Sequence, residues 1–233
     1  MNFTPLASSS HGNAYLLGDG NTRILLECGV PYRRLQQMLG FSVVGIDACL
    51  ISHEHKDHSY CYKDIIKNGI PVFASEGTAD ALDCDLISAI EEREAFSIGS
   101  MDVMAFATFH DAAEPFGYLV RSRRDGDKFM FATDTVNLGY QFPGVNIVAI
   151  EANYDAEYLA RATRMPEKVK KRIENSHMEI GRTCAFIQKM DKSLLRRVYL
   201  LHLSDACSNE YEFERRVRRV CPGVDVVVCQ KGL

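Results

Sequence analysis

Short apolar runs recur along the chain between polar or glycine-containing stretches, and each has the length of a β-strand. The first two, residues 14–17 and 23–27, flank Gly18-Asp19-Gly20-Asn21, which predicts a β-hairpin with a glycine-rich turn. Residues 8–13 before them have the composition of a loop. Residues 83–99 are charged and indicate only a short strand or loop. Similar apolar runs predict further strands at residues 48–51, 71–74, 101–109, 117–121, 128–132, 147–150, 198–201 and 224–228.

Stretches with helical spacing fill most of the intervals between these runs. Pro31 and Gly40 bracket one of them, and Ser75 and Asp155 can cap two others. The predicted helices are residues 31–39, 62–67, 75–82, 156–162, 166–174, 180–190 and 208–220. Hairpin strands come first, and strands alternating with helices follow. This order predicts an α/β (α+β) fold in which two mixed β-sheets pack face to face with helices outside. Without a linker or repeat, residues 1–233 are expected to form a single domain.

Composition sets broad limits on function. The chain has 233 residues, is 46% hydrophobic and carries a net charge of −4, so nucleic-acid binding would need a local basic patch. No apolar run approaches the roughly 20 residues that a membrane span needs. The N-terminus lacks the pattern of a secretory signal. Eight scattered cysteines without a Cys-x-x-Cys pair indicate a reduced, cytoplasmic location.

The densest group of reactive side chains follows the apolar run at residues 48–51. Three histidines and one aspartate stand within six residues, as His53, His55, Asp57 and His58. This position, at the carboxyl end of a strand, is where α/β folds place their chemistry. His53 and His55 alternate in an extended segment and can chelate a first ion, while Asp57 and His58 can hold a second. Imidazole and carboxylate suit Zn²⁺, Mn²⁺ or Fe rather than Ca²⁺. The alternative is a solvated, histidine-rich loop.

Three further predicted strands each end in a potential ligand, namely His110, Asp134 and His202. A lone histidine after a strand is more often structural, but three such endings beside a metal-like loop favour ligands. His110 could complete the shell of the first ion and His202 that of the second. Asp134 could bridge both ions with its two oxygens. Each ion would keep an open position for water and substrate, as a catalytic site needs.

The motif His53-x-His55-x-Asp57-His58, followed by His110, Asp134 and His202, resembles the metallo-β-lactamase superfamily over nearly the whole chain. The sequence looks most like the YycJ (WalJ) type of small metallo-hydrolase, a relative of RNase Z and RNase J. This closer resemblance rests on residues 8–13, 110–118, 151–155 and 202–204. It implies a four-layer αββα sandwich, two bound divalent metal ions and phosphodiester hydrolysis on nucleic acid, as in a DNA exonuclease.

The inferred reaction is hydrolysis of a phosphate ester by water that the metals activate. Asp57 or Asp134 can orient this water and accept its proton. His177 is the candidate for contacting the phosphate or protonating the leaving oxygen, and a polar cap between two helices is its alternative role. RNase Z and RNase J have a histidine near this point, which favours the functional role. The family's Gly-His-Leu-Ser-Asn is replaced here by Ser176-His177-Met178-Glu179-Ile180, which lacks the small polar residues after the histidine.

Glu151, Asn153 and Asp155 follow one of the predicted strands. Their side chains could fix the orientation of ligand histidines through hydrogen bonds. For Asp155, a plain helix cap is an equally good interpretation.

One local basic stretch could bind the backbone of a nucleic acid, and DNA is preferred over RNA as the partner. It lies just before His177, and only Glu167 opposes its charge. An ordinary solvated helix face is the alternative. The six cations are Arg161, Arg164, Lys168, Lys170, Lys171 and Arg172.

Other functions remain open on the sequence alone. A thioesterase of the glyoxalase II type, or a small cyclic-phosphodiester hydrolase, would use the same ligands, and the acidic net charge favours a small substrate. A di-iron redox protein normally needs a flavin partner domain, for which the chain has no motif. A metal-stabilised binding module without catalysis is not favoured, because every expected ligand position is filled.

Overall fold

The structure, a computed structural model, describes residues 1–229. The chain divides into two compact units that interleave along the sequence, and each is described in turn. Unit 1 comprises residues 1–107 and 112–127, and unit 2 comprises residues 108–111 and 128–229. The strands form mixed β-sheets accompanied by helices, which confirms the predicted fold class. The single domain expected for residues 1–233 stays a prediction, and its last four residues lie outside the described part.

Unit 1 contains a six-stranded sheet in the order β1-β2-β3-β4-β5-β6. The first three strands are antiparallel neighbours, and β3 to β6 run parallel. Residues 8–13 are not the expected loop, because they form the end of β1, a tight turn and the start of β2. The bounds are β1 Asn2–Ser9, β2 Gly12–Gly18, β3 Arg23–Leu26, β4 Ala48–Leu50, β5 Val72–Ala74 and β6 Ile87–Ala89.

The remaining elements of unit 1 are three antiparallel strands and four short helices. The strands are β7 Ala95–Ile98, β8 Met101–Ala107 and β9 Phe116–Ser122, and the helices are α1 Tyr32–Met38, α2 Lys56–Ser59, α3 Tyr62–Lys67 and α4 Glu76–Ala81. Ser75 caps α4 as predicted, since its side chain accepts a hydrogen bond from the N–H of Thr78. Buried apolar side chains of the six-stranded sheet, among them Leu25, Cys49 and Val72, pack against Leu35 of α1 and Ile65 of α3 in one core.

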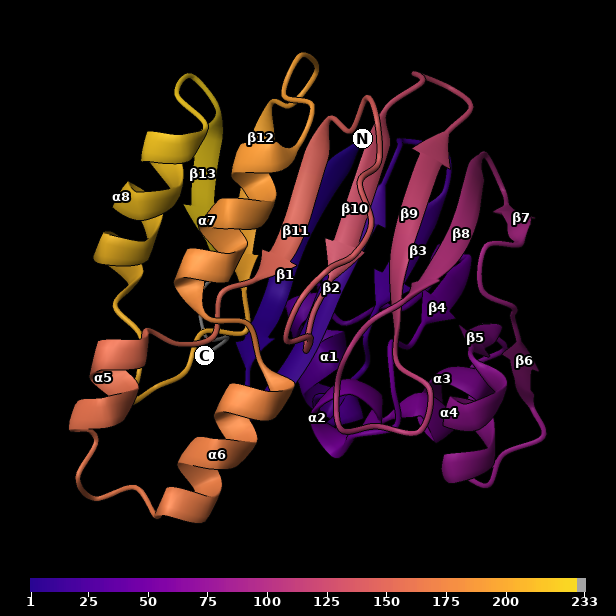
Figure 1. The fold of residues 1–233 in the computed structure, drawn as a ribbon. Helices are drawn as coiled ribbons and strands as arrows, with labels where there is room; N and C mark the ends of the chain where they lie inside the picture. The colour runs from indigo at the N-terminus through magenta and orange to yellow at the C-terminus, as the bar shows by residue number, and fades with distance from the viewer. Residues whose placement is uncertain (230–233) are drawn as a thin grey trace. The chain divides into compact units, whose positions relative to one another are not determined.

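Unit 2 is built on four parallel strands in the order β13-β12-β11-β10. Every residue of β11 is buried, as expected for a strand covered on both faces, where apolar residues run on without alternation. Figure 1 shows α8 alongside β13 and α7. The strands are β10 Lys128–Ala132, β11 Ile147–Glu151, β12 Arg197–Leu201 and β13 Asp225–Val228. The helices are α5 Ala156–Arg161, α6 Glu167–Ser176, α7 Ile180–Lys189 and α8 Glu210–Val220.

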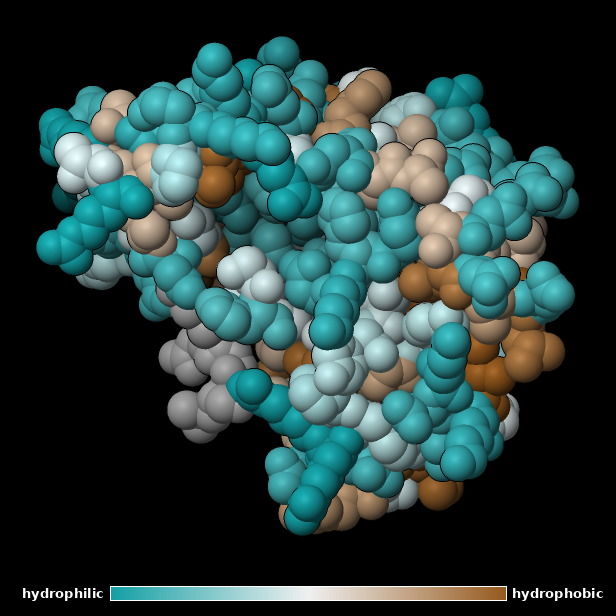
Figure 2. All heavy atoms as spheres, turned by 90° about the horizontal axis from the view of Figure 1, so that it is seen from below, coloured by the Kyte–Doolittle hydropathy of each residue, from teal (hydrophilic) through white to brown (hydrophobic). Residues whose placement is uncertain are grey.

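The face of the molecule drawn in Figure 2 is largely polar. Figure 2 shows hydrophilic side chains over most of the face that it draws, with hydrophobic residues scattered among them. Among residues 1–229, no helix is long and apolar enough to cross a bilayer.

Gly29, three residues after β3, packs closely against the backbone of the loop that carries Asp57 and His58. A Cβ atom at this position would lie 1.7 Å from the carbonyl oxygen of Asp57 and 2.6 Å from the nitrogen of His58. The same segment is bonded to that loop, because the N–H of Cys28 donates to the carbonyl of His58 at 2.8 Å. The absence of a side chain at Gly29 therefore lets the loop pack directly on the end of β3.

We expect Gly29→Ala to lower the free energy of unfolding by about 1–3 kcal/mol, because backbone atoms cannot give way as a side chain can. Urea unfolding followed by circular dichroism measures this change. Gly139→Ala is the control, since a Cβ there meets nothing within 4 Å. Equal unfolding midpoints for the two variants would contradict the close packing at Gly29.

Candidate metal centre

Four predicted ligands in unit 1, His53, His55, Asp57 and His58, form what we call the loop cluster. The cluster follows β4 and runs into α2. His53 Nε2 lies 3.1 Å from His55 Nδ1, and His58 Nε2 lies 3.4 Å from Asp57 Oδ2. The ring centroids of His53 and His58 are 4.2 Å apart. The structure thus brings together the four side chains that the sequence singled out in this loop.

Hydrogen bonds fix the start of the loop cluster. The carbonyl of Ile51 accepts a 2.6 Å bond from the hydroxyl of Tyr118, and the carbonyl of Ser52 accepts a 2.9 Å bond from the N–H of Phe116. The Ser52 hydroxyl lies 2.9 Å from His53 Nδ1. With Nδ1 engaged in this way, Nε2 is the nitrogen that His53 presents to the cluster.

Glu27 is a fully buried carboxylate behind His58. It accepts a 3.2 Å hydrogen bond from the N–H of Ser52 and lies 3.5 Å from His58 Nδ1. Burial raises the pKa of Glu27, although the neighbouring His58 and the bonds from Ser52 act in the opposite direction. Asn13 lies at the other ring nitrogen, with its Nδ2 3.2 Å from His58 Nε2. The imidazole of His58 therefore has a polar side chain near each of its two nitrogens.

The candidate residues of unit 2, His110, Asp134, His177 and His202, form what we call the strand-end cluster. Asp134 stands two residues after β10, and His202 directly follows β12. Both have a left-handed backbone, with φ of 41° for Asp134 and 53° for His202. Aspartate and histidine tolerate this region better than most residues, but it still carries strain. The fold thus holds these two side chains in a costly conformation.

Asp134 lies among the three histidines of the strand-end cluster. Its Oδ1 is 3.4 Å from His202 Nδ1, and its Oδ2 is 3.6 Å from His110 Nε2 and 3.8 Å from His177 Nδ1. The residue is only 2% exposed. Because imidazoles face both oxygens, each oxygen of this carboxylate can take part in binding a cation.

Glu151, the last residue of β11, is the buried carboxylate behind the strand-end cluster. Its Oε2 accepts hydrogen bonds from the N–H groups of Thr135 at 2.8 Å and Met178 at 3.0 Å. Its Oε1 lies 2.6 Å from His177 Nδ1 and 3.4 Å from His202 Nδ1. Burial alone would raise the pKa of Glu151, but the charge of His177 and the hydrogen bonds from His177 and His202 hold it below its ordinary value.

The electrostatic partner of Glu151 is the imidazole of His177. Burial disfavours the charged imidazolium, but the carboxylates of Glu151 and Asp134 outweigh it and raise the pKa of His177. The sequence marked His177 as either a functional residue or a helix cap. The structure places it directly after α6 and also among the strand-end residues.

Asn153 and Asp155 have different surroundings. Asn153 Nδ2 lies 3.2 Å from His202 Nδ1 and donates a 2.7 Å hydrogen bond to the His202 carbonyl. Asp155 instead caps α5, accepting hydrogen bonds from the N–H groups of Glu157 and Tyr158. Of the polar side chains after β11, Glu151 and Asn153 therefore touch the histidines, and Asp155 stabilises a helix.

Helix α6 positions two members of the strand-end cluster. His110 Nδ1 lies 2.6 Å from the carbonyl oxygen of Ser176, the last residue of the helix, and His177 follows immediately. Burial lowers the pKa of His110, against the pull of Asp134. Arg172 of the same helix donates a 2.8 Å bond to Asp111. The end of α6 is thus tied to the segment that carries His110.

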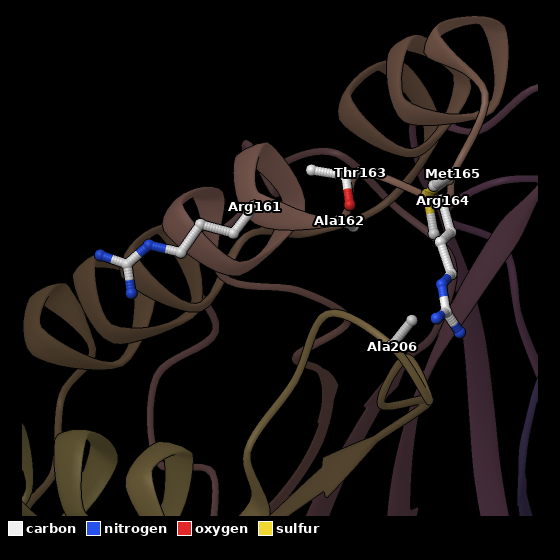
Figure 3. Close-up of a pocket in the computed structure, with 6 residues that line it drawn as sticks. All are labelled: Arg161, Ala162, Thr163, Arg164, Met165 and Ala206. Carbon is white, nitrogen blue, oxygen red and sulfur yellow. The ribbon is translucent and has the colours of Figure 1, made fainter.

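The basic stretch lies at the end of α5, in the connection after it and along α6. Three of its cations have acidic partners, as Arg161–Glu157 at 3.2 Å, Lys170–Glu167 at 3.1 Å and Arg172–Asp111 at 2.8 Å. Arg161 and Arg164 line a cavity of about 470 Å³ whose wall includes Ala206, on the loop that follows His202 (Figure 3). This part of the stretch is therefore next to a segment that also carries a candidate ligand.

Sequence reasoning did not identify Glu27 or the contact that Asn13 makes. Glu27 could have been found from its position at the end of an otherwise apolar run. A carboxylate buried there would require a hydrogen-bonding or charged partner. For Asn13, the signal was its place in a segment that resembles the family. Glu151 and Asn153 were anticipated, together with Asp155, as residues that could orient ligand histidines.

The donor sets of both clusters fit divalent metal ions. A separation of 3.1 Å, as between His53 Nε2 and His55 Nδ1, is close to that of two nitrogens that each bond one ion at about 2.0–2.1 Å. In the strand-end cluster, ligand atoms of Asp134, Glu151 and two histidines all lie within 4.8 Å of one another. Nitrogen and carboxylate donors of this kind suit Zn²⁺ and Mn²⁺.

Comparison with known proteins identifies the family. Residues 22–203 match the family model described as the β-lactamase superfamily domain. The chain is 29% identical over 225 residues to "Exodeoxyribonuclease YycJ" of Bacillus anthracis, covering 88% of this chain and 83% of that protein. It is 28% identical over 222 residues to "Exodeoxyribonuclease WalJ" of Streptococcus pneumoniae, covering 87% of this chain and 81% of that protein.

The fold agrees with this assignment. The crystal structure of the metallo-β-lactamase fold protein YhfI from Bacillus subtilis superposes with a TM-score of 0.74. The match has 13% sequence identity and covers 99% of this chain and 97% of that one. The chain therefore belongs to the β-lactamase superfamily and is a hydrolase with the metallo-β-lactamase fold.

Proposed function

We propose that the chain is a metal-dependent phosphodiesterase that degrades DNA in the cytoplasm. The observation that carries this proposal is the arrangement of the strand-end cluster, where one buried carboxylate lies among three histidines and a second carboxylate holds two of them. Two relatives that match most of the chain are named exodeoxyribonucleases, which favours DNA as the substrate. Free thiols at all eight cysteines are consistent with a reduced compartment.

The proposed cofactors are two divalent ions, Zn²⁺ or Mn²⁺, with Fe as a further candidate. The proposed ligands are His53, His55, Asp57, His58, His110, Asp134 and His202. Two such ions would supply hydroxide from water near neutral pH and stabilise charge on the phosphoryl oxygens. The donor atoms and spacings within each cluster support this set.

The carboxylates of the two clusters have different parts in the proposed reaction. The side chain of Asp57 is 26% exposed, so it can reach a water molecule, orient it and accept its proton. Asp134 is almost fully buried and held among histidines, which suits a bridging ligand that also orients the attacking water. The more exposed Asp57 is therefore the first residue to replace in a test of catalysis.

His177 is the proposed contact to the phosphate or the leaving oxygen. A proton on its Nδ1 is held by Glu151 Oε1 at 2.6 Å, so the imidazole keeps a fixed orientation. The other nitrogen, Nε2, then remains to bind a phosphoryl oxygen or to protonate the leaving oxygen. Glu151 acts through His177 and is a positioning residue.

The basic stretch is the proposed contact to the DNA backbone. Within residues 1–229, Arg164, Lys168 and Lys171 form no ion pair, whereas the other three cations each have an acidic partner. Cations without a competing carboxylate can bind phosphates without first breaking a salt bridge. These three side chains are therefore expected to contribute most of the salt-dependent affinity.

The direct test is degradation of 5′-labelled single-stranded DNA, double-stranded DNA and RNA with Mn²⁺ or Zn²⁺ added. We expect metal-dependent loss of labelled DNA, and Asp57→Asn should abolish it, because an amide cannot accept the proton from water. A thioester and a cyclic phosphodiester are assayed in parallel. Hydrolysis of one of these, with every polymer left intact, would contradict the proposal and show a small substrate.

A second prediction concerns His177. We expect His177→Ala to lower kcat by ~10²–10⁴-fold, the usual contribution of a general acid. Metal content, measured by mass spectrometry, should stay at the wild-type value. His11→Ala is the matched control, since this exposed histidine is not a proposed ligand. Loss of metal from the His177→Ala protein would show that the residue is a ligand or a structural support instead.

A third prediction concerns salt. In the cleavage-deficient Asp57→Asn protein, replacing Arg164, Lys168 and Lys171 with alanine should reduce the slope of log affinity against log salt by about 2, since each phosphate contact to a single strand contributes about 0.7. Fluorescence anisotropy of a labelled oligonucleotide measures the slope. Replacing Lys63 and Lys67 of α3 should leave it unchanged. An unaltered slope in the triple variant would remove the basic stretch from DNA binding.

A further inference from the structure

Two large aromatic side chains next to candidate ligands are exposed to solvent. Tyr60, two residues after His58, is 48% exposed, and Phe109, directly before His110, is 56% exposed. Exposed aromatic rings are the usual means by which proteins hold the bases of single-stranded nucleic acids, since every base has a face on which a ring can stack. Both rings are therefore candidates for binding a base.

The surroundings of the two rings differ. The ammonium group of Lys56 lies over the Tyr60 ring, 5.0 Å from its centroid, so this ring already has a cation on one face. Within residues 1–229, the Phe109 ring has no aromatic or cationic neighbour. Phe109 is consequently the ring that can accept a base without displacing a cation or another ring.

The backbone of Phe109 is fixed, although its side chain is exposed. Its N–H donates a 3.0 Å hydrogen bond to Thr135 Oγ1, and its carbonyl accepts a 2.9 Å bond from the N–H of Val136. Thr135 and Val136 directly follow Asp134, and Thr135 is itself bonded to Glu151. The ring is thus attached to the same backbone that holds the strand-end carboxylate.

The side chain of the next residue is buried. The side chain of His110 is only 1% exposed, and its Nδ1 is bonded to the carbonyl of Ser176. One of two consecutive rings therefore belongs to the strand-end cluster, while the other is displayed to solvent. Because the backbone of Phe109 is already fixed, a base that stacks on its ring would need to order only the side chain and not the loop.

We propose that Phe109 is a nucleobase-stacking residue that positions the base beside the phosphodiester to be cleaved. This inference rests on the proposed DNA-degrading function and adds to it a preference for strands whose bases are unpaired. Stacking recognises any base, so Phe109 would contribute affinity and alignment without sequence specificity.

The test compares an oligothymidylate with a matched oligomer whose terminal nucleotides lack bases at both ends. We expect Phe109→Ala to lower kcat/KM on the oligothymidylate about tenfold, mostly through KM, because a stacked base is lost. The same variant should match wild type on the baseless oligomer. Phe109→Trp, which keeps an aromatic face, should retain activity on both.

Tyr211→Ala is the control, because Tyr211 is another exposed aromatic residue, at 77%, on α8. Equal activity of Phe109→Ala and wild type on the oligothymidylate would overturn the stacking role. An equal loss on both oligomers would also overturn it, since it would show a structural effect. If wild type cuts neither oligomer, the proposed function fails first, and this outcome is distinct because it does not depend on the variant.

Discussion

Moving a carboxylate out of water is costly unless hydrogen bonds and a positive partner compensate. Among the buried carboxylates of this chain, Glu27 in unit 1 and Glu151 in unit 2 are both at 0% exposure. Glu151 accepts two backbone N–H bonds and contacts two imidazoles, so its desolvation is well compensated. Glu151 in turn helps to orient His177 and His202, the two histidines that it contacts.

The same residue types recur behind both clusters. In unit 1, Glu27 and Asn13 contact the two nitrogens of His58, and in unit 2, Glu151 and Asn153 both approach Nδ1 of His202. Glu27, Asp134 and His202 also share a left-handed backbone. A strained backbone of this kind persists only where surrounding contacts fix it. Here the buried carboxylates and their hydrogen bonds provide those contacts.

The elements with strong periodicity could be predicted from the sequence, including β4, β10, β11 and β12 and most of the helices. Within each unit the predicted ligands lie together in one cluster. This could be expected, because every predicted ligand comes after a strand that the apolar pattern predicts. β1 was missed, since Asn2–Ser9 carries little hydrophobic alternation and contains Pro5. The partner of His177 could not be predicted, because Glu151 lies 26 residues earlier and only tertiary folding brings them together.

Helix α6 carries four of the six cations of the basic stretch, and its end also fixes two histidines, His110 through the Ser176 carbonyl and His177 through the chain itself. A ligand that binds the cations of this helix would thus contact the element that also positions both imidazoles. If binding at the cations changes the affinity of the histidines for their ligand, binding at the histidines must change the affinity of the cations by the same factor. A substitution at one end of α6 is therefore expected to affect the other end, because one helix carries the cations and positions both histidines.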